Sequence, residues 1–453
     1  MLKKQQPNVF PLHLAPIDAF YCADDSADYP MTSVIYLDFV GVVQRDAFEL
    51  ALEDALDRHP LLSSLIKPAK RSKPCWVSSG DVKPSIDWGT LDEPIALSDG
   101  ESFDLSREVG LRVWVRTGED RCRVTLQVHH ACTDGTGVYR FIGDLLACYG
   151  IRVGDGTDPP ELSDVDPRLL RDRRRRMGEL GVHGTARGLL QAGFSYGWDV
   201  FGKRVRSLSS PSEKSASVTT PFPGICSKSF SREEHKSLRA AAGKYGVMLN
   251  DLLLAEMFQT VLQWNEQVDK HPTRGWLRIM MPFDMRDKRD FAMPAGNLTS
   301  YTFITRKSET CSDFDALVRG IRDETARIKH ERLGTNFVDA IMLAQRVPKV
   351  LSYLLKRDRC IASVILSNIG EPSRRFTARL PRKKGKVVCG DLLLDNISGV
   401  PPMRTKSHAT WAIFTYARQM TISLRCDPFR FSREQTEALL DVYMQRLARH
   451  ISS

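Results

Sequence analysis

The segment that decides the fold of this protein runs from Gln127 to Gly137 and reads QVHHACTDGTG. Residues 122–128 alternate between polar and apolar side chains, a pattern typical of a half-buried strand. Two adjacent histidines end this strand, and Asp134 follows His130 after three intervening residues. Glycines at 135 and 137 then predict a turn. A histidine at a strand end is held rigidly, which suits general acid–base chemistry.

The two histidines are expected to differ in role. Adjacent strand residues point to opposite faces, so one ring can face a cleft while the other packs behind it. For the same reason His129 and His130 cannot both bind one metal ion, and no further His/Cys cluster lies nearby. We therefore predict no metal site, and a site for proton transfer instead.

Two neighbouring residues allow other chemistry. Cys132 as a nucleophile would need a lowered pKa and a base, so we expect a small buried residue there. Asp134 could orient His130 as in a hydrolase triad, but no G-x-S-x-G elbow supplies a serine nucleophile. If Asp134 is buried it needs a cationic partner. Arg286 follows an apolar strand and could form a bidentate pair with it.

Composition sets broad limits. A chain of 453 residues is expected to form two domains of about 200 residues each. Its 42% hydrophobic and 26% charged residues are typical of a soluble globular protein. We find neither an apolar run of about 18 residues nor a secretory signal. The ten cysteines form no CxxC pair, which indicates a reduced, cytoplasmic protein without a structural zinc site.

The formal charge of +10 is concentrated in two blocks, Arg171–Arg176 and Arg374–Lys386. We expect both blocks to be solvated surface or loop. The basic residues do not alternate with aromatic residues, and we find no known nucleic-acid-binding motif. Nucleic acid is therefore not an expected partner. An acidic carrier protein, a phosphorylated cofactor or an anionic membrane surface fits the charge.

Periodicity predicts an alternation of strands and helices in both halves. Pro60 should end the first long helix, since the residue before proline leaves the α region. Capping boxes at Ser231 and Ser432 predict two helix starts. Predicted strands cover 31–41, 61–66, 75–78, 111–116, 122–128, 276–281, 298–305, 361–366, 387–394, 409–416 and 421–426. Predicted helices cover 44–58, 136–149, 232–245, 250–264, parts of 313–357, and 433–447.

We divide the chain into a first domain at 1–155, a crossover at 156–222 and a second domain at 223–453. The crossover contains a basic piece and then an aromatic, apolar piece at 188–198. Such a segment could lie on a membrane surface. Glycines at 184, 188, 193 and 197 weaken it as a helix, so we expect it to pack against the body of the protein instead.

The segment His129–Gly135 resembles the HHxxxDG signature of condensation domains and CoA-dependent acyltransferases. Further matches in order make the resemblance more specific than the motif alone, and together they span nearly the whole chain. They are Pro11–Leu12, Arg58–Leu62, Gly246–Asp251, Asp284-x-Arg286 with Gly296-Asn297, and Ser367–Gly370.

The resemblance implies an α/β (α+β) fold of two chloramphenicol-acetyltransferase-like sandwich domains with a channel between them. It implies that His130 is the general base, which deprotonates an alcohol or amine as that atom attacks a thioester. No acyl-enzyme is needed, and acyl-CoA or acyl-phosphopantetheine is a co-substrate rather than a bound cofactor. The expected protein is a monomer.

The resemblance also assigns supporting roles. Asp134 would pair with Arg286, His129 would support the site, and Gly135 would leave room for the pantetheine arm. Channel or turn positions would be Gly296, Asn297, Ser367 and Asn368.

Two differences from the known members indicate which branch of the superfamily this sequence resembles. The DFGWG motif of plant acyltransferases is missing, and residues 391–400 read DLLLDNISGV instead. These 453 residues contain no recognisable adenylation or carrier domain, so we expect a free-standing alcohol-acyltransferase or polyketide-associated type. The hydroxyl of Thr299 or Ser300 could donate a hydrogen bond to the oxyanion of the tetrahedral intermediate, or these residues could have only a structural role in the strand. The alternatives to CoA-dependent transfer are a carrier-dependent condensation enzyme and a non-catalytic binding module.

Overall fold

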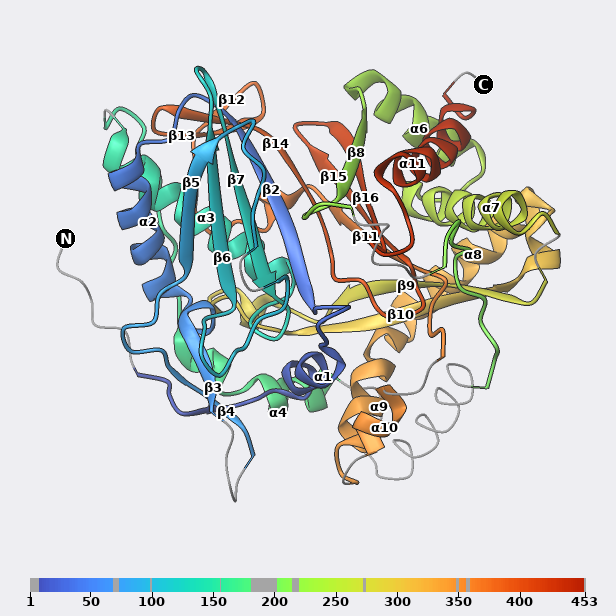
Figure 1. Ribbon diagram of the computed structural model, residues 1–453, viewed down its shortest axis with the longest axis horizontal. Coiled ribbons are helices and arrows are strands. Elements are labelled where there is room, and N and C mark those ends of the chain that lie inside the picture. Colours follow the sequence, from blue (N-terminus) through green and yellow to red (C-terminus); the bar gives the residue numbers. More distant parts are fainter. Residues whose placement is uncertain are drawn as a thin grey trace. The chain divides into compact units, whose positions relative to one another are not determined.

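A computed structural model describes residues 8–67, 73–97, 100–154, 156–180, 202–213, 220–271, 274–347, 350–355 and 359–451 (Figure 1). The chain forms two compact units, each built from three segments. Unit 1 comprises Met1–Glu179, Asp284–Thr299 and Glu371–Ile397, and unit 2 comprises Leu180–Phe283, Ser300–Gly370 and Ser398–Ser453. The division expected from the sequence differs, since it assigns 284–299 and 371–397 to the second domain.

Unit 1 is built on a seven-stranded sheet in the order β12-β13-β14-β2-β7-β6-β5. Strands β2, β6 and β7 match predicted strands, whereas β5 and the short β12 were not predicted. The strands are β2 (Thr32–Val40), β5 (Ser85–Thr90), β6 (Leu111–Thr117), β7 (Arg121–His129), β12 (Arg382–Lys383), β13 (Lys386–Cys389) and β14 (Leu392–Val400). The prediction of one strand over 387–394 is wrong, because Gly390 at φ +59° turns the chain between β13 and β14.

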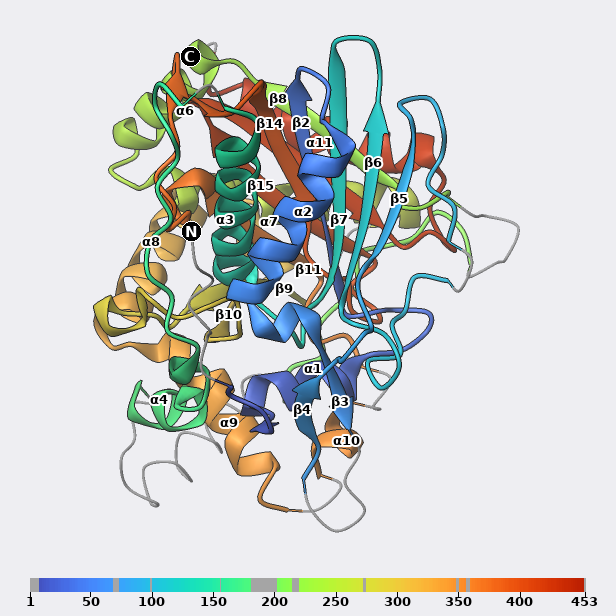
Figure 2. The ribbon, with the colours of Figure 1, turned by 90° about the vertical axis from the view of Figure 1, so that its left-hand side faces the viewer.

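Two helices, α2 (Arg45–Arg58) and α3 (Gly135–Val153), lie side by side in unit 1 (Figure 2). The apolar positions that predicted them, such as Leu52 and Phe141, are buried. Helix α2 ends at Arg58, just before the His59-Pro60 pair, as expected. These helices therefore follow directly from the 3.6-residue period of the sequence.

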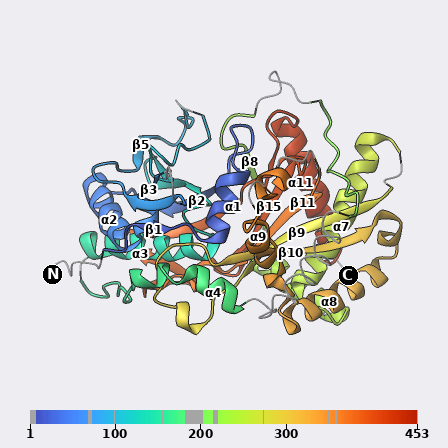
Figure 3. The ribbon, with the colours of Figure 1, turned by 90° about the horizontal axis from the view of Figure 1, so that it is seen from below.

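A small sheet of β1 (Leu12–His13), β4 (Cys75–Ser78) and β3 (Ser64–Lys67) completes unit 1 together with α1 (Pro16–Asp24), seen from below in Figure 3. The strand predicted over 61–66 is wrong in its first half, where residues 60–63 form a 3-10 turn. The N–H of Leu62 donates to the carbonyl of His59 in this turn. Helix α1 was not predicted.

Unit 2 contains a six-stranded mixed sheet in the order β10-β9-β11-β15-β16-β8. Strand β11 runs parallel to both neighbours, and β16 runs antiparallel to β15 and β8. Every strand except β8 corresponds to a predicted one. The strands are β8 (Ile225–Phe230), β9 (Trp276–Asp284), β10 (Thr299–Lys307), β11 (Val364–Gly370), β15 (Ala409–Tyr416) and β16 (Gln419–Cys426).

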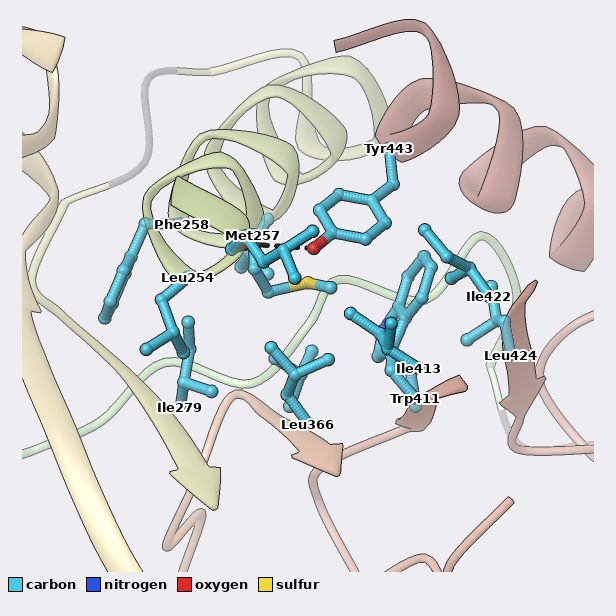
Figure 4. Close-up of a cluster of buried hydrophobic side chains, with 14 of the residues drawn as sticks. Leu254, Met257, Phe258, Ile279, Leu366, Trp411, Ile413, Ile422, Leu424 and Tyr443 are labelled. Atoms are coloured by element: carbon cyan, nitrogen blue, oxygen red, sulfur yellow. Dashed lines mark hydrogen bonds between the residues drawn. The ribbon is translucent and has the colours of Figure 1, made fainter. Parts of the chain in front are cut away.

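The core of unit 2 lies between this sheet and helices such as α7 (Leu249–Asp269) and α11 (Arg433–Ala448), and Figure 4 shows part of it. Met257 of α7 packs with Leu366 of β11 and Trp411 of β15, and the hydroxyl of Tyr443 on α11 donates to the carbonyl of Leu253. Both predicted capping boxes are confirmed. The helices are α6 (Arg232–Lys244), α7 (Leu249–Asp269), α8 (Phe314–His330), α9 (Asn336–Ala344), α10 (Val350–Leu355) and α11 (Arg433–Ala448).

The first basic block is not simply solvated surface, so that expectation is wrong for two of its arginines. Arg173 and Arg176 begin helix α4 (Arg173–Leu180) and are buried. Arg173 makes a bidentate pair with Asp18, at 3.0 and 2.8 Å, and Arg176 pairs with Asp290 at 2.8 Å. Buried carboxylates need cationic partners, and this block supplies them within unit 1.

The rest of the crossover and the second basic block can be described only in part. The segment 188–198, with its predicted packing or membrane role, lies outside the described residues. In the second block the exposed residues include Arg374, Arg379 and 382–384, as expected. Within the described ranges no helix is both long and apolar enough to cross a membrane.

Candidate functional site

The HHxxxDG segment lies in unit 1 at the junction of β7 and α3. The N–H of His129 donates to the carbonyl of Gly110, and the N–H of His130 donates to the carbonyl of Met31. These bonds tie the end of β7 to the chain on both sides. Asp134 is the N-cap of α3, so the turn that carries His130 is fixed at each end.

His130 is a buried histidine with an aromatic support. Its ring stacks on Tyr21 of α1, with centroids 4.2 Å apart and planes inclined by 24°. Burial lowers the pKa of His130 from 6.5 to about 4, although the Asp134 carboxylate and the backbone of His130 itself oppose the shift. Nδ1 is buried and has no hydrogen-bond partner in the described part of the chain. The imidazole is therefore neutral near pH 7 and able to accept a proton.

His129 has a different environment. Its Nδ1 accepts a hydrogen bond from the N–H of Ala131 at 3.1 Å, which puts the ring proton on Nε2. Nε2 lies 3.7 Å from Oδ1 of Asp25, and the ring meets Phe103 edge-on. These contacts hold the turn and leave His129 no evident role in proton transfer.

Asp134 accepts hydrogen bonds at both carboxylate oxygens. The ion pair predicted with Arg286 is present, but the expected bidentate geometry is wrong, because only Nη1 of Arg286 reaches Asp134 while Nη2 donates to the carbonyl of Gly296. Its Oδ1 accepts from the N–H of Gly137 at 2.9 Å. Its Oδ2 accepts from Nη1 of Arg286 at 2.9 Å and from the N–H of Leu298 at 2.7 Å. Within the described residues the His130 ring donates no hydrogen bond to this carboxylate, so the triad interpretation gains no support.

Arg286 is held as a buried cation. Burial alone would lower the pKa of its guanidinium, but the carboxylates of Asp134 and Asp284 outweigh burial and raise it. Nη2 donates to the carbonyl of Gly296 at 2.7 Å. The segment 284–299 is thereby bound to the HHxxxDG turn, which accounts for its place in unit 1.

Asn297 holds the same turn from the other side. Its Nδ2 lies 2.8 Å from the carbonyl oxygens of both His130 and Ala131, and 3.0 Å from Oδ1 of Asp18. Asp18 in turn is the partner of Arg173. The sequence predicted a turn or channel position at Asn297, but neither Asp18 nor Tyr21 belongs to a motif that could have identified it.

Gly137 was expected only to form a turn, and the structure places it in the first turn of α3. A Cβ at this position would clash with Oγ1 of Thr133 and would lie 2.9 Å from the backbone nitrogen of Gly296. Only glycine allows the start of α3 to approach the Gly296 turn so closely.

Gly137→Ala should therefore destabilise unit 1 by roughly 1–3 kcal/mol, the usual cost of overpacking. Chemical denaturation measures this loss. Gly243→Ala on α6, where an added Cβ meets no atom within 4 Å, is the matched control and should cost less than Gly137→Ala. Equal stability of the two variants would contradict the close approach.

The Arg58–Leu62 match also contributes to unit 1. Nδ1 of the buried His59 accepts from the N–H of Ala295 at 2.8 Å, and Nε2 lies 3.1 Å from Oδ2 of Asp144 on α3. Arg58 donates to the same carboxylate at 2.6 Å. This histidine thus links α3 to the segment 284–299 and has a structural role.

The remaining predicted residues fall in different places. Gly135 opens α3, and a Cβ there would meet no atom within 4 Å. Cys132 is buried as expected, and burial raises the pKa of its thiol well above the usual range.

Ser367 and Asn368 lie on β11 in unit 2. Thr299 and Ser300 are both buried, and we assign no oxyanion donor. No metal-ligating cluster of His, Cys, Asp and Glu occurs among the described residues.

Comparisons with known sequences give distant relatives. No family model matches the chain. The uncharacterized proteins MT2362 and Rv2305 of Mycobacterium tuberculosis are each 23% identical over 382 residues, which cover 79% of this chain and 83% of the relative.

Comparisons with solved structures cover the chain almost completely. The first condensation domain of the calcium-dependent antibiotic synthetase has a TM-score of 0.70 at 13% identity, over 99% of this chain and 97% of that one. A mutant starter condensation domain of rhizomide synthetase in complex with C8-CoA gives 0.66 at 12% identity, over 98% and 95%. Polyketide synthase associated protein 5 of Mycobacterium tuberculosis gives 0.63 at 14% identity, over 97% and 98%. The fold expected from the HHxxxDG resemblance is confirmed.

Proposed function

We propose that this chain, which has the fold of condensation domains, is an acyltransferase that moves an acyl group from a pantetheine thioester to an alcohol or amine. The observation that carries the proposal is the state of His130, a buried and neutral imidazole on a turn fixed by Asp134, Arg286 and Asn297. Such rigidity is what a general base requires.

In the proposed reaction the neutral His130 accepts the proton of the acceptor hydroxyl or amine. The acceptor oxygen or nitrogen attacks the thioester carbonyl, and the tetrahedral oxyanion collapses with loss of the thiolate. The imidazolium then returns its proton to the thiolate. That return is favourable, because burial makes the imidazolium of His130 a stronger acid than a thiol with a usual pKa of about 8.5.

The donor is proposed to be an acyl-CoA. The rhizomide synthetase starter domain was solved with C8-CoA, and Gly135 has room beside it for a slender thioester arm. A carrier-bound donor is the second candidate, favoured by the exposed cations Arg379, Arg382, Lys383 and Lys384, which would attract an acidic carrier protein.

Thiol release from a panel of acyl-CoAs, with alcohol and amine acceptors added in turn, tests the proposal. Acceptor-dependent release by the wild type supports it. Transfer only from an acyl carrier protein would establish the second candidate. Tight carrier binding without turnover from either donor would establish a non-catalytic module.

The pH dependence of kcat/KM should report the lowered pKa of His130. A base with a pKa of about 4 stays unprotonated as the pH falls through 6.5, so activity should be retained to about pH 5 and fall around pH 4. The unfolded chain takes up its histidine proton near 6.5, so this group also lowers stability progressively from pH 6.5 to about 4. An acid limb near 6.5, measured on protein shown to be folded, would contradict the assignment.

A further inference from the structure

Asp18 of α1 is a carboxylate at which five hydrogen-bond donors meet. Its Oδ1 accepts from Nη1 of Arg173 and from Nδ2 of Asn297, both at 3.0 Å. Its Oδ2 accepts from Nη2 of Arg173 at 2.8 Å, from the N–H of Ala15 at 3.0 Å and from the indole N–H of Trp76 at 3.2 Å. A carboxylate accepts at both oxygens, whereas an amide of the same shape would turn its NH₂ group towards some of these donors.

The pair of Asp18 and Arg173 is held in one geometry within unit 1. Asp18 is 0% exposed and Arg173 is 1% exposed, so separating them would leave two charges buried without partners. The Nε of Arg173 also donates to the carbonyl of Leu170 at 3.2 Å, which fixes the guanidinium on its own side. Asn297 and the His130 turn belong to the same unit.

The amide of Asn297 connects this pair to the His130 turn. Its Nδ2 also lies 2.8 Å from the carbonyl oxygens of His130 and Ala131, so three acceptors surround one NH₂ group. Its Oδ1 is buried and has no hydrogen-bond partner among the described residues, an arrangement that costs free energy. A flipped amide would place Oδ1 against the three acceptor oxygens. The carboxylate of Asp18 therefore helps to decide which way the amide of Asn297 points.

We infer that the buried Asp18–Arg173 pair positions His130 for proton transfer, acting through Asn297; the inference rests on the proposed function. The carbonyl of His130 is held by Asn297, and its N–H donates to the carbonyl of Met31. Both peptide groups that flank its Cα are thus fixed, and with them the direction in which the imidazole leaves the backbone. Asp18, Arg173 and Asn297 act through this backbone, so they are positioning residues. One arginine of the first basic block thereby gains a role in acyl transfer.

Arg173→Lys tests the inference, because lysine keeps the charge and loses the planar fork that meets both oxygens of Asp18. With His130 misplaced, kcat for acyl transfer should fall roughly 10²-fold, whereas KM for acyl-CoA should change little. Arg176→Lys is the matched control, because Arg176 is buried on the same helix but pairs with Asp290. It should lose stability and keep its kcat. An equal kcat in the two variants would overturn the inference.

A second variant separates positioning from folding. Asp18→Leu combined with Arg173→Met leaves neither charge buried alone, so it should lose less stability than the sum of the two single changes. Its kcat should nevertheless stay low, because Asn297 still lacks the carboxylate that orients its amide. Recovery of kcat together with stability would show that the pair serves folding only.

Modification of Cys132 reports on the turn without any transfer reaction. This thiol lies two residues after His130 and is 0% exposed. In folded protein treated with a maleimide and digested for mass spectrometry, Cys132 should react roughly tenfold faster in Arg173→Lys than in the wild type, because the turn opens locally. Cys389 on β13 of the same unit is also 0% exposed and should react at the wild-type rate.

The result with Cys132 separates this inference from the proposed function. Faster modification of Cys132 alone supports the role of the pair in holding the turn, even if no acyl donor is turned over. An unchanged rate at Cys132, or an equal rise at Cys132 and Cys389, would refute that role whether or not the protein transfers acyl groups.

Discussion

His130→Ala should reduce acyl transfer by roughly 10²–10⁴-fold, the range expected for loss of a general base. Without the imidazole the acceptor must lose its proton to water, and the thiolate must leave unprotonated. The ring lies at a turn and stacks on Tyr21, so its removal leaves the backbone bonds of the turn intact. Thiol release measures the rate, and thermal unfolding of the same preparation shows whether the fold persists.

Two further variants make this result specific. His130→Gln keeps most of the side-chain volume without the base and should be as impaired as His130→Ala. His13→Ala replaces an exposed histidine on β1 of the same unit and should retain full activity. Wild-type rates in folded His130→Gln would remove His130 from the mechanism.

The sequence alone predicted the parts of the site that lie within one motif or one strong pattern. The alternation through residue 128 predicted β7, and the buried N-cap Asp134 required a cation that Arg286 supplies. Both predictions rest on local rules: strand periodicity and the cost of an unpaired buried charge.

What the sequence did not predict depends on long-range packing. Arg173 belongs to a run of arginines whose members look alike, and only the fold brings this one to Asp18. Tyr21 supports His130 from a helix without a motif. The boundaries of the units depend on the segments 284–299 and 371–397, whose partners are far away in sequence.

Asp134→Ala should cost about 3–5 kcal/mol of unfolding free energy, because it removes the buried carboxylate partner of the Arg286 guanidinium and leaves this cation only the partly exposed Asp284. It also removes the cap of α3 and the acceptor for the N–H of Leu298. Urea denaturation measures the loss, and Asp104→Ala, at an exposed carboxylate of the same unit, is the control that should change stability by less than about 1 kcal/mol.

Removing both charges distinguishes an ion-pair effect from a packing effect. Asp134→Asn combined with Arg286→Met should lose less stability than the sum of the two single changes, because neither charge is then left buried alone. Additive losses would mean that the two side chains act independently, despite the 2.9 Å between Nη1 of Arg286 and Oδ2 of Asp134. Since this pair joins the segment 284–299 to the His130 turn, a coupled loss of stability should be accompanied by a loss of acyl transfer.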